Sequence, residues 1–228
     1  MKHEIIKPPN MDFPLVEAFF TTKTGGDAGK LSSAGVPSGQ KVYLPIQKHT
    51  DRVVILEADT KPEVADAVIT SRKDILVGVQ AADCVPIVVL DKRNMVIGAV
   101  HAGWRGTAAQ ILKKTIRAMS EKFHSSADDM FIAIGPSIRG CCYHVGADVH
   151  EAICASAGDG DYSSERESGF FVDLASANML QAISLGVMRD KIWISGECTF
   201  CNPERFHSYR YHGDRAGRQG GFIGVFLC

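Results

Sequence analysis

Ten short segments rich in β-branched and aromatic residues limit the folds open to this chain more than any other feature. Such runs, bounded by glycine, proline and polar residues, are typical of β-strands. Several are apolar at every position, which indicates strands covered on both faces. The ten expected strands are residues 16–22, 41–46, 53–57, 67–70, 75–79, 85–90, 95–100, 130–134, 191–195 and 222–227.

Three further segments have helical patterns. Thr107 begins a capping-box sequence, Thr-Ala-Ala-Gln, and apolar residues follow it at intervals of three and four as far as Phe123. Asp173 is expected to cap a second helix that ends near Gly186, and a third is expected over residues 147–157. Many strands and few helices, partly segregated along the chain, predict an α+β fold with helices packed outside the sheets.

Length and composition favour a single domain. With 228 residues, of which 45% are hydrophobic and 22% charged, the chain has the make-up of an ordinary globular protein. The glycine-rich residues 23–40 and residues 158–169 are predicted to be loops rather than linkers, because the strand-like segments beside them lack cores of their own. We therefore expect one domain that spans residues 1–228.

Charge and cysteine content exclude several classes of function. The formal net charge of −1 gives no overall attraction to nucleic acid or to anionic membranes. No stretch reaches the roughly 18 apolar residues of a membrane span, and the N-terminus lacks the apolar core of a signal peptide. Seven cysteines, an odd number, favour reduced thiols in such a chain. We expect a cytoplasmic protein that binds neither nucleic acid nor membrane, and the sequence does not predict its oligomeric state.

The chemistry is concentrated around His101 and Cys84. His101 opens the sequence His-Ala-Gly-Trp-Arg-Gly at the end of one expected strand, and Cys84 directly precedes another. His49 is a candidate third ligand. One cysteine and two histidines leave the fourth position of a tetrahedral zinc ion open, as catalytic rather than structural zinc sites do. These residues predict a metal-assisted enzyme.

Residues beside these candidate ligands indicate how a substrate is held. Gly103 and Gly106 permit close approach of the backbone to a ligand, and Arg105 offers a bidentate donor for phosphate or carboxylate. Asp83 is expected to accept the N–H of a ligand histidine. Taken alone, a histidine at a strand end or a cysteine in an apolar run is usually structural, and the neighbours are what favour a site.

The sequence resembles the YfiH-type laccase-domain family, also described as polyphenol oxidase-like proteins or multifunctional purine nucleoside phosphorylases. The matching segments occur in order over nearly the whole chain. They are Phe20-Thr-Thr22 with Gly25-Gly26, Gln47-x-His49-x-x-x-Val53, Asp66-Ala-Val-Ile-Thr70, Ala82-Asp-Cys84-x-Pro86, His101-Ala-Gly-Trp-Arg-Gly106, Gly135-Pro-Ser-Ile138, Cys141-Cys-Tyr143-x-Val145, Cys198-Thr199, Phe206-x-Ser-Tyr-Arg210 and Gly217-Arg218.

The resemblance implies a fold, a metal and a reaction. The fold is one of paired mixed β-sheets flanked by helices, a layered αββα arrangement similar to the catalytic domain of cytotoxic necrotising factor toxins. The implied zinc ligands are His49, Cys84 and His101. The implied reactions are phosphorolysis of adenosine, inosine and methylthioadenosine and deamination of adenosine, with a purine nucleoside and phosphate as small-molecule partners.

Further residues are predicted to act around the metal. The candidates for binding phosphate are Lys23, Arg105, Arg210 and Arg218, and the candidates for moving protons are Asp83 and His144. Two of them depart from the family pattern, since Lys23 stands where arginine is usual and His144 where glutamate is usual. Residues 27–46 also form a shorter segment than in the family, and these differences bear on the substrate site more than on the metal.

Three alternatives remain open. Without a metal, Cys84 is a candidate nucleophile and His101 its base, in a hydrolase or amidase acting for example on a peptidoglycan precursor. One cysteine and two histidines also describe a copper site. The eight histidines contain no His-x-His pair of the multicopper oxidase kind, so zinc is favoured over a copper-dependent polyphenol oxidase. In the third alternative the zinc ion only supports a protein-binding surface.

A second pattern of metal-binding residue types lies near the C-terminus. Cys198-x-x-Cys201 is followed by His207 and His212 at intervals too short for a zinc finger, which has about 12 residues between its cysteine and histidine pairs. The pattern indicates either a zinc knuckle or, more simply, buried thiols beside surface imidazoles.

Overall fold

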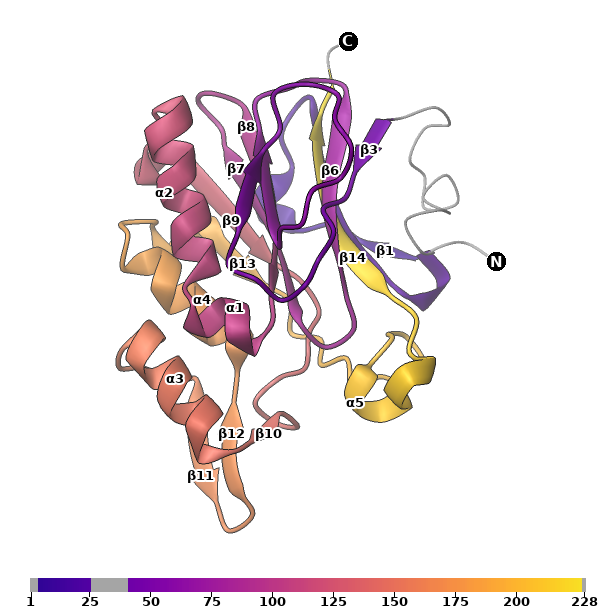
Figure 1. Ribbon diagram of the computed structural model, residues 1–228, viewed down its shortest axis with the longest axis vertical. Helices are drawn as coiled ribbons and strands as arrows, with labels where there is room; N and C mark the ends of the chain where they lie inside the picture. Colours follow the sequence, from indigo (N-terminus) through magenta and orange to yellow (C-terminus); the bar gives the residue numbers. More distant parts are fainter. Residues whose placement is uncertain (1–3, 26–40, 227–228) are drawn as a thin grey trace.

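Two mixed β-sheets form the centre of the molecule. The computed structural model describes residues 4–25 and 41–226 (Figure 1). The five-stranded sheet has the order β1 (Ile5–Ile6), β2 (Val16–Thr21), β14 (Gln219–Val225), β6 (Ile75–Ala81) and β3 (Lys41–Tyr43). The six-stranded sheet has the order β13 (Ile192–Ile194), β9 (Met130–Ile134), β7 (Val85–Asp91), β8 (Val96–Ala102), β5 (Ala67–Thr70) and β4 (Val53–Ile55). Neighbouring strands are antiparallel except in the pairs β3–β6, β4–β5 and β9–β13.

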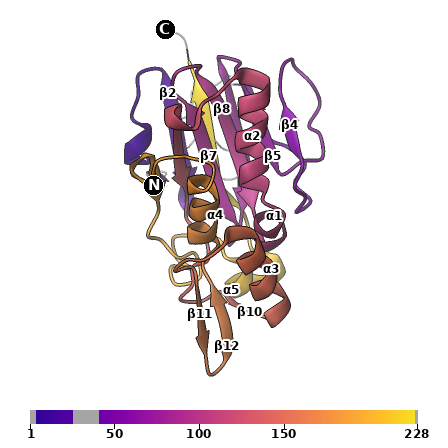
Figure 2. The same cartoon turned by 90° about the vertical axis from the view of Figure 1, so that its left-hand side faces the viewer.

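The remaining elements lie outside these two sheets. The helices are α1 (Trp104–Ala108), α2 (Ile111–Phe123), α3 (Ala147–Ala157), α4 (Leu174–Ile183) and α5 (Tyr209–His212). A small third sheet has the order β10 (His144–Val145), β12 (Gly169–Val172) and β11 (Ser163–Arg166). Short 3₁₀ helices cover Pro9–Met11, Lys23–Gly25, Ala127–Asp129, Arg189–Lys191 and Gly213–Arg215. Figure 2 shows α2 and α4 lying along the six-stranded sheet, with α3 and the small sheet beyond their ends.

The six-stranded sheet is buried on both faces. Along β7, Ile87 and Val89 belong to the core shared with the helices, whereas Val88 and Leu90 belong to the core shared with the five-stranded sheet. All four side chains are fully buried. Successive side chains of a strand point to opposite faces, so two apolar layers require a strand that is apolar throughout. This is why several of the expected strands have no polar position.

The structure confirms the α+β class, with paired mixed sheets and helices packed against them. Each of the ten expected segments contains a β-strand. Asp173 caps α4 by accepting from the Ser176 N–H. In the part of the chain described, α1 to α4 all contact the six-stranded side of the pair through one continuous core. No helix among these residues is long and apolar enough to cross a membrane.

Two local predictions are wrong. Thr107 does not cap a helix, because it lies inside α1 and its buried hydroxyl and carbonyl accept from Asn178 and Gln181 of α4. Gln110 has a left-handed backbone, φ 60°, that separates α1 from α2. Residues 158–169 are also not simply a loop, since β11 lies within them and pairs with β12. The predicted loop 23–40 lies mostly outside the described residues.

Candidate metal centre

Cys84 and His101 meet at one end of the six-stranded sheet. The antiparallel register of β7 and β8 places Pro86 opposite His101 and Val85 opposite Ala102. Cys84 directly precedes β7, so its side chain lies beside the last residues of β8. Of the two, His101 is buried, with 4% of its surface exposed, and Cys84 is half-buried. The sheet itself therefore brings together two residues that are far apart in the sequence.

His49 lies beside Cys84 and His101 and belongs to the loop that precedes β4. The side-chain amide of Gln47 fixes this loop to β6 by donating to the Gln80 carbonyl at 2.7 Å and accepting from the Gln80 N–H at 2.8 Å. His49 has a left-handed backbone, φ 57°, which is uncommon for a residue other than glycine. Such a conformation persists only where the surroundings hold it.

The carboxylate of Asp66 provides that hold. It is fully buried just before β5, and it accepts from the backbone N–H groups of Lys48, His49 and Thr50 at 3.2, 3.0 and 2.6 Å. It also accepts from the Thr50 hydroxyl at 2.7 Å and from His101 Nδ1 at 2.8 Å. One buried side chain therefore fixes both the loop that carries His49 and the ring of His101. The sequence predicts Asp83 as the acceptor from a ligand histidine; this prediction is wrong, because Asp66 is the carboxylate beside His101.

The three candidate ligands converge on one point. Because Asp66 occupies Nδ1 of His101, Nε2 is the atom left to face Cys84. Cys84 Sγ lies 3.8 Å from His49 Nε2, and the two imidazole rings have centroids 5.0 Å apart at an angle of 71°. One sulfur and two nitrogen donor atoms lie within 4.8 Å of one another.

This arrangement fits a zinc ion. Bonds of about 2.0–2.3 Å in a tetrahedral site place donor atoms roughly 3.3–3.8 Å apart. A ligand histidine whose other ring nitrogen donates to a carboxylate is the usual support for such a site. Cys84 Sγ and Nε2 of both histidines are thus the atoms that would hold the ion.

The protonation of these groups is set by their neighbours. Burial alone would raise the pKa of Cys84, but hydrogen bonds with His101 and His49 lower it to about 6. Burial would likewise lower the pKa of His101, but Asp66 and Cys84 raise it to about 9. Burial would raise the pKa of Asp66, but hydrogen bonds from His101 and Thr50 outweigh this effect and hold the pKa below the ordinary value. Without a metal, Cys84 is therefore a thiolate beside an imidazolium at neutral pH.

Gly103 leaves the space that the ligands occupy. A Cβ atom at this position would lie 2.9 Å from Cys84 Sγ and 3.1 Å from His49 Cδ2. Its backbone, φ −73° and ψ 178°, is open to any residue, so the requirement for glycine is steric. The sequence predicts that the backbone of Gly103 comes close to a bound ligand. In the structure, the side chains that come close to Gly103 are the candidate metal ligands Cys84 and His49.

The Tyr143 phenol lies within electrostatic reach of Cys84 and of two guanidinium groups. The pKa of Tyr143 is raised to about 12, first by burial and then by the charge of Cys84, while Arg210 and Arg105 oppose the change. Arg210 Cζ lies 5.2 Å from the centre of the Tyr143 ring, and Arg105 stacks on Trp104 at 4.3 Å. Tyr143 therefore remains a hydrogen-bond donor at neutral pH, next to positive charge that suits an anion.

Asp83 organises the loops on the other side of Cys84. Its carboxylate accepts from the hydroxyls of Thr199 and Ser208 at 2.6 and 3.0 Å, and from the Arg210 N–H at 2.6 Å. It is buried, with a left-handed backbone, φ 82°. With all three of these donors bound, the geometry of the carboxylate suits positioning of the Arg210 backbone.

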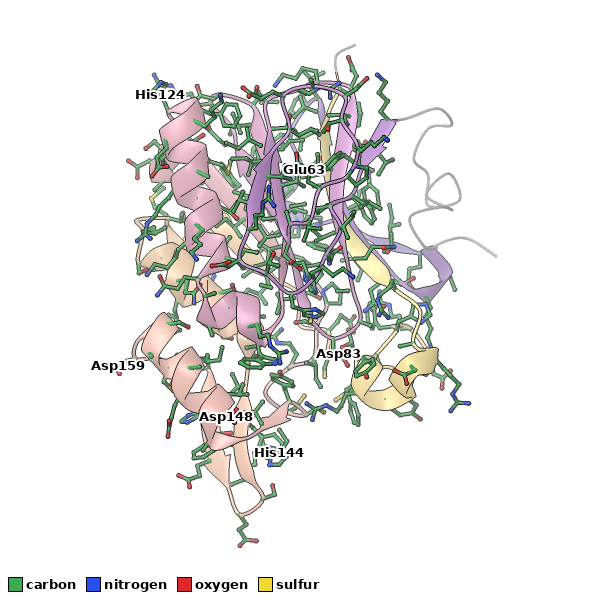
Figure 3. All side chains as sticks on the ribbon, viewed as in Figure 1. Glu63, Asp83, His124, His144, Asp148 and Asp159 are labelled. Carbon is green, nitrogen blue, oxygen red and sulfur yellow. The ribbon has the colours of Figure 1, made fainter. Side chains whose placement is uncertain are left out.

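The other predicted residues lie at varied places. His144 is exposed on β10 and packs against Phe171, and its carbonyl accepts from Arg210 at 3.1 Å. Lys23 donates to the Pro203 carbonyl and lies 3.1 Å from His212 Nε2. The Arg218 guanidinium bonds the carbonyls of its own turn. Figure 3 shows Asp83 at the end of the sheets nearest α5, and His144 farther out on the three-stranded sheet.

Asp66 and Tyr143 are site residues that the analysis of the sequence did not single out. Both lie in segments that match the family pattern, which was the available signal. Asp66 is the charged residue directly before a fully buried strand, and Tyr143 follows two cysteines. Their roles depend on contacts between separate segments, as of Asp66 with Thr50 and with His101, so residue spacing gave no indication of them.

Comparisons with known proteins agree with this picture. A family model described as multi-copper polyphenol oxidoreductase laccase matches residues 28–226. The chain is 40% identical over 172 residues to a protein of Aquifex aeolicus named purine nucleoside phosphorylase, which covers 75% of this chain and 77% of that one. It is 32% identical over 198 residues to a protein of an unknown prokaryotic organism named adenosine deaminase, covering 81% and 74%. The crystal structure of YlmD from Geobacillus stearothermophilus superposes with a TM-score of 0.86 at 25% identity, covering 96% of this chain and 94% of that one.

Proposed function

We propose that this chain, which belongs to the multi-copper polyphenol oxidoreductase laccase family, is a zinc-dependent purine nucleoside phosphorylase that also deaminates adenosine. One observation carries the proposal: two histidines and a cysteine converge within 4.8 Å, with Asp66 fixing His101 from behind. The names of the relatives, purine nucleoside phosphorylase and adenosine deaminase, supply the substrate class.

The donor set supports zinc more than copper. Two imidazoles and one thiolate, arranged with an open side, are typical of catalytic zinc. Oxidation by several copper ions needs further histidine-rich sites. Among the described residues, one other group of three or more candidate ligands comes together, and it consists entirely of cysteines. When bound, zinc supplies a Lewis acid that polarises a substrate oxygen or activates a nucleophile.

The surrounding residues are suited to phosphorolysis. Phosphate attacks the ribose C1′ while the purine leaves, and the sugar acquires positive charge that the phosphate stabilises. In our proposal the guanidinium groups of Arg210 and Arg105 hold the phosphate. The Tyr143 hydroxyl, protonated because its pKa is about 12, donates a hydrogen bond to substrate. Asp83 positions Arg210 through the backbone N–H.

Deamination uses water in place of phosphate. Water attacks C6 of adenine, and ammonia leaves once its nitrogen has been protonated. Asp83 is occupied by three donors, so His144 is the remaining candidate for moving these protons. Lys23 and Arg218 are predicted phosphate ligands whose observed contacts lie elsewhere, so we assign them a smaller role.

Product analysis tests the proposal. Metal-replete protein is incubated with adenosine, with and without phosphate, and adenine, inosine and hypoxanthine are separated by chromatography. We expect adenine and ribose 1-phosphate only when phosphate is present, and inosine in both reactions. Inosine and methylthioadenosine are tested in parallel. No phosphate-dependent release of base from any of the three nucleosides would refute the phosphorylase proposal.

Thiol catalysis is the second candidate, because the geometry also resembles a nucleophile with its base and orienting acid. Cys84, His101 and Asp66 form a hydrogen-bonded series, and the pKa of Cys84 is lowered to about 6. Such an enzyme attacks an amide with the Cys84 sulfur and needs no metal. An acyl adduct on Cys84, formed by metal-free protein that still turns over, would establish this candidate instead.

A further inference from the structure

Four cysteine side chains that the proposed reaction does not use meet at one point of the molecule. Cys141 and Cys142 lie in the turn before β10, while Cys198 and Cys201 come from the segment after β13. Their four sulfur atoms all lie within 4.8 Å of one another. The sequence pattern places Cys198 and Cys201 near His207 and His212, whereas in the structure Cys141 and Cys142 lie beside the two cysteines.

The spacing of the sulfur atoms fits one ion better than a disulfide. Cys201 Sγ lies 3.2 Å from Cys142 Sγ and 3.7 Å from Cys141 Sγ. A tetrahedral zinc ion with bonds of about 2.3 Å places its sulfurs about 3.8 Å apart. A disulfide needs about 2.05 Å and joins only two sulfurs, whereas Cys201 is close to both members of the Cys141–Cys142 pair. We propose that these four cysteines form a second metal site, a tetrathiolate site for zinc.

The backbone holds both cysteine pairs in place. The N–H groups of Cys142 and Tyr143 both donate to the Arg139 carbonyl at 2.9 Å, which closes the turn around Cys141. In the other segment, Asn202 donates to the Cys198 carbonyl through its backbone at 3.1 Å and through its side chain at 3.0 Å. The two segments are also joined directly, because a bridge pairs Ser137 with Cys198. The ligands are therefore ordered before an ion binds.

The site is accessible, and positive charge lies near it. Cys141 and Cys201 are exposed, whereas Cys198 is buried. Cys141 and Cys198 line an open groove of about 480 Å³, together with Arg139 and Arg166. The Arg166 guanidinium donates to the carbonyls of Gly140 and Cys141 at 3.1 and 3.4 Å. Four thiolates around a divalent ion carry two net negative charges. Arg139 is paired with Asp173 at 2.9 Å, so Arg166 is the guanidinium group that partly offsets them.

An ion here would fix the loops that border the candidate metal centre. Cys142 directly precedes Tyr143, and Cys198 directly precedes Thr199, whose hydroxyl bonds Asp83 at 2.6 Å. The tetrathiolate site therefore acts on the reaction only by positioning these groups. It is closed by four protein ligands, as structural zinc sites are.

Metal content tests the second site without any assay of activity. The full chain is purified under reducing conditions, loaded with zinc, dialysed and analysed by mass spectrometry of the metal. We expect two zinc ions per chain in the natural sequence and one in Cys201→Ser and in His49→Ala. Cys154→Ser is the matched control, because Cys154 lies on α3 and contacts His150, outside the cluster, and it should retain two.

Cobalt in place of zinc identifies which site each ion occupies. Charge-transfer absorption grows with the number of thiolates, so His49→Ala should keep the strong tetrathiolate spectrum and Cys201→Ser should lose it. If Cys201→Ser does not fold, Cys201→His keeps a ligand and should retain two ions with a weaker spectrum. Natural protein that binds one ion, lost in His49→Ala, would overturn the proposal. So would a Cys142–Cys201 disulfide found by mass spectrometry, or two zinc ions retained by Cys201→Ser.

Discussion

Replacing Gly103 by alanine should weaken zinc binding and slow the reaction at the candidate metal centre while leaving the fold intact. The added Cβ would lie 2.9 Å from Cys84 Sγ and 3.1 Å from His49 Cδ2, whereas unstrained contacts of this kind are about 3.5–4.0 Å. The sulfur must therefore move by roughly 0.6–1.1 Å. Zinc–ligand distances tolerate only about 0.2 Å, so both donor atoms cannot keep their bonds to one ion.

The size of the effect follows from that displacement. Misplacement of about 1 Å costs about a hundredfold in rate, or about 2.7 kcal/mol in transition-state stabilisation. We expect Gly103→Ala to lower kcat/KM for phosphorolysis about a hundredfold and to weaken zinc binding at least tenfold. The backbone of Gly103 is open to alanine, so the only destabilisation is the crowding of Cys84 and His49, about 1–3 kcal/mol.

Two measurements on matched variants check this prediction. Zinc affinity is measured by competition with a chromophoric chelator, and phosphorolysis by release of adenine from adenosine. Gly196→Ala is the control, because no atom lies within 4 Å of the Cβ that it adds. Gly103→Ala protein with the zinc affinity of the natural sequence would show that Cys84 and His49 do not share an ion, and the steric reasoning would be refuted.

Three further predictions concern single groups. In metal-free protein, the rate of alkylation of Cys84 should have a pH midpoint near 6, because the pKa of this thiol lies at about 6 rather than at the ordinary 9.0. Bound zinc should protect Cys84 from alkylation. A midpoint near 9 would contradict the thiolate–imidazolium pair. Asp66→Asn replaces one carboxylate oxygen by an NH₂ group, which cannot accept from the backbone N–H groups of Lys48 and Thr50. Zinc affinity, measured by chelator competition, should therefore fall 10–100-fold. Unchanged affinity would exclude support of His101 by this carboxylate. Arg210→Ala should raise the KM for phosphate about 10–100-fold, since a charge-assisted hydrogen bond contributes about 1.5–3 kcal/mol; the exposed Arg117→Ala is the control, and equal KM values for both would remove Arg210 from the phosphate site.

The strands and the ligand set were predictable for physical reasons. A strand buried on both faces must be apolar throughout, so β7 and β8 stand out in the sequence without any partner being known. Cys84 and His101 lie at the ends of these two strands, and antiparallel pairing brings such ends together. His49 was less evident, because it lies in a loop whose course is fixed by Asp66 and by Gln47.

Features that depend on distant partners were not predictable in the same way. The capping-box pattern at Thr107 failed because α4 supplies donors to this residue inside α1, and tertiary contacts override a local propensity. The strands β10 and β11 are short and mostly polar or exposed, so they lack the apolar run that marks a buried strand, and β12 is apolar but only four residues long. The cysteine cluster joins segments about 60 residues apart, so residue spacing brought only His207 and His212 into consideration beside Cys198 and Cys201.

Anomalous diffraction at the zinc absorption edge, from crystals of the full chain grown with zinc and then back-soaked, tests the central claim most directly. We predict a peak bonded to Cys84 Sγ and to Nε2 of His49 and His101 at about 2.0–2.3 Å, with a fourth position that a protein side chain does not fill. Crystals in which these three side chains are ordered but no peak lies between them would contradict a zinc-dependent reaction at this site.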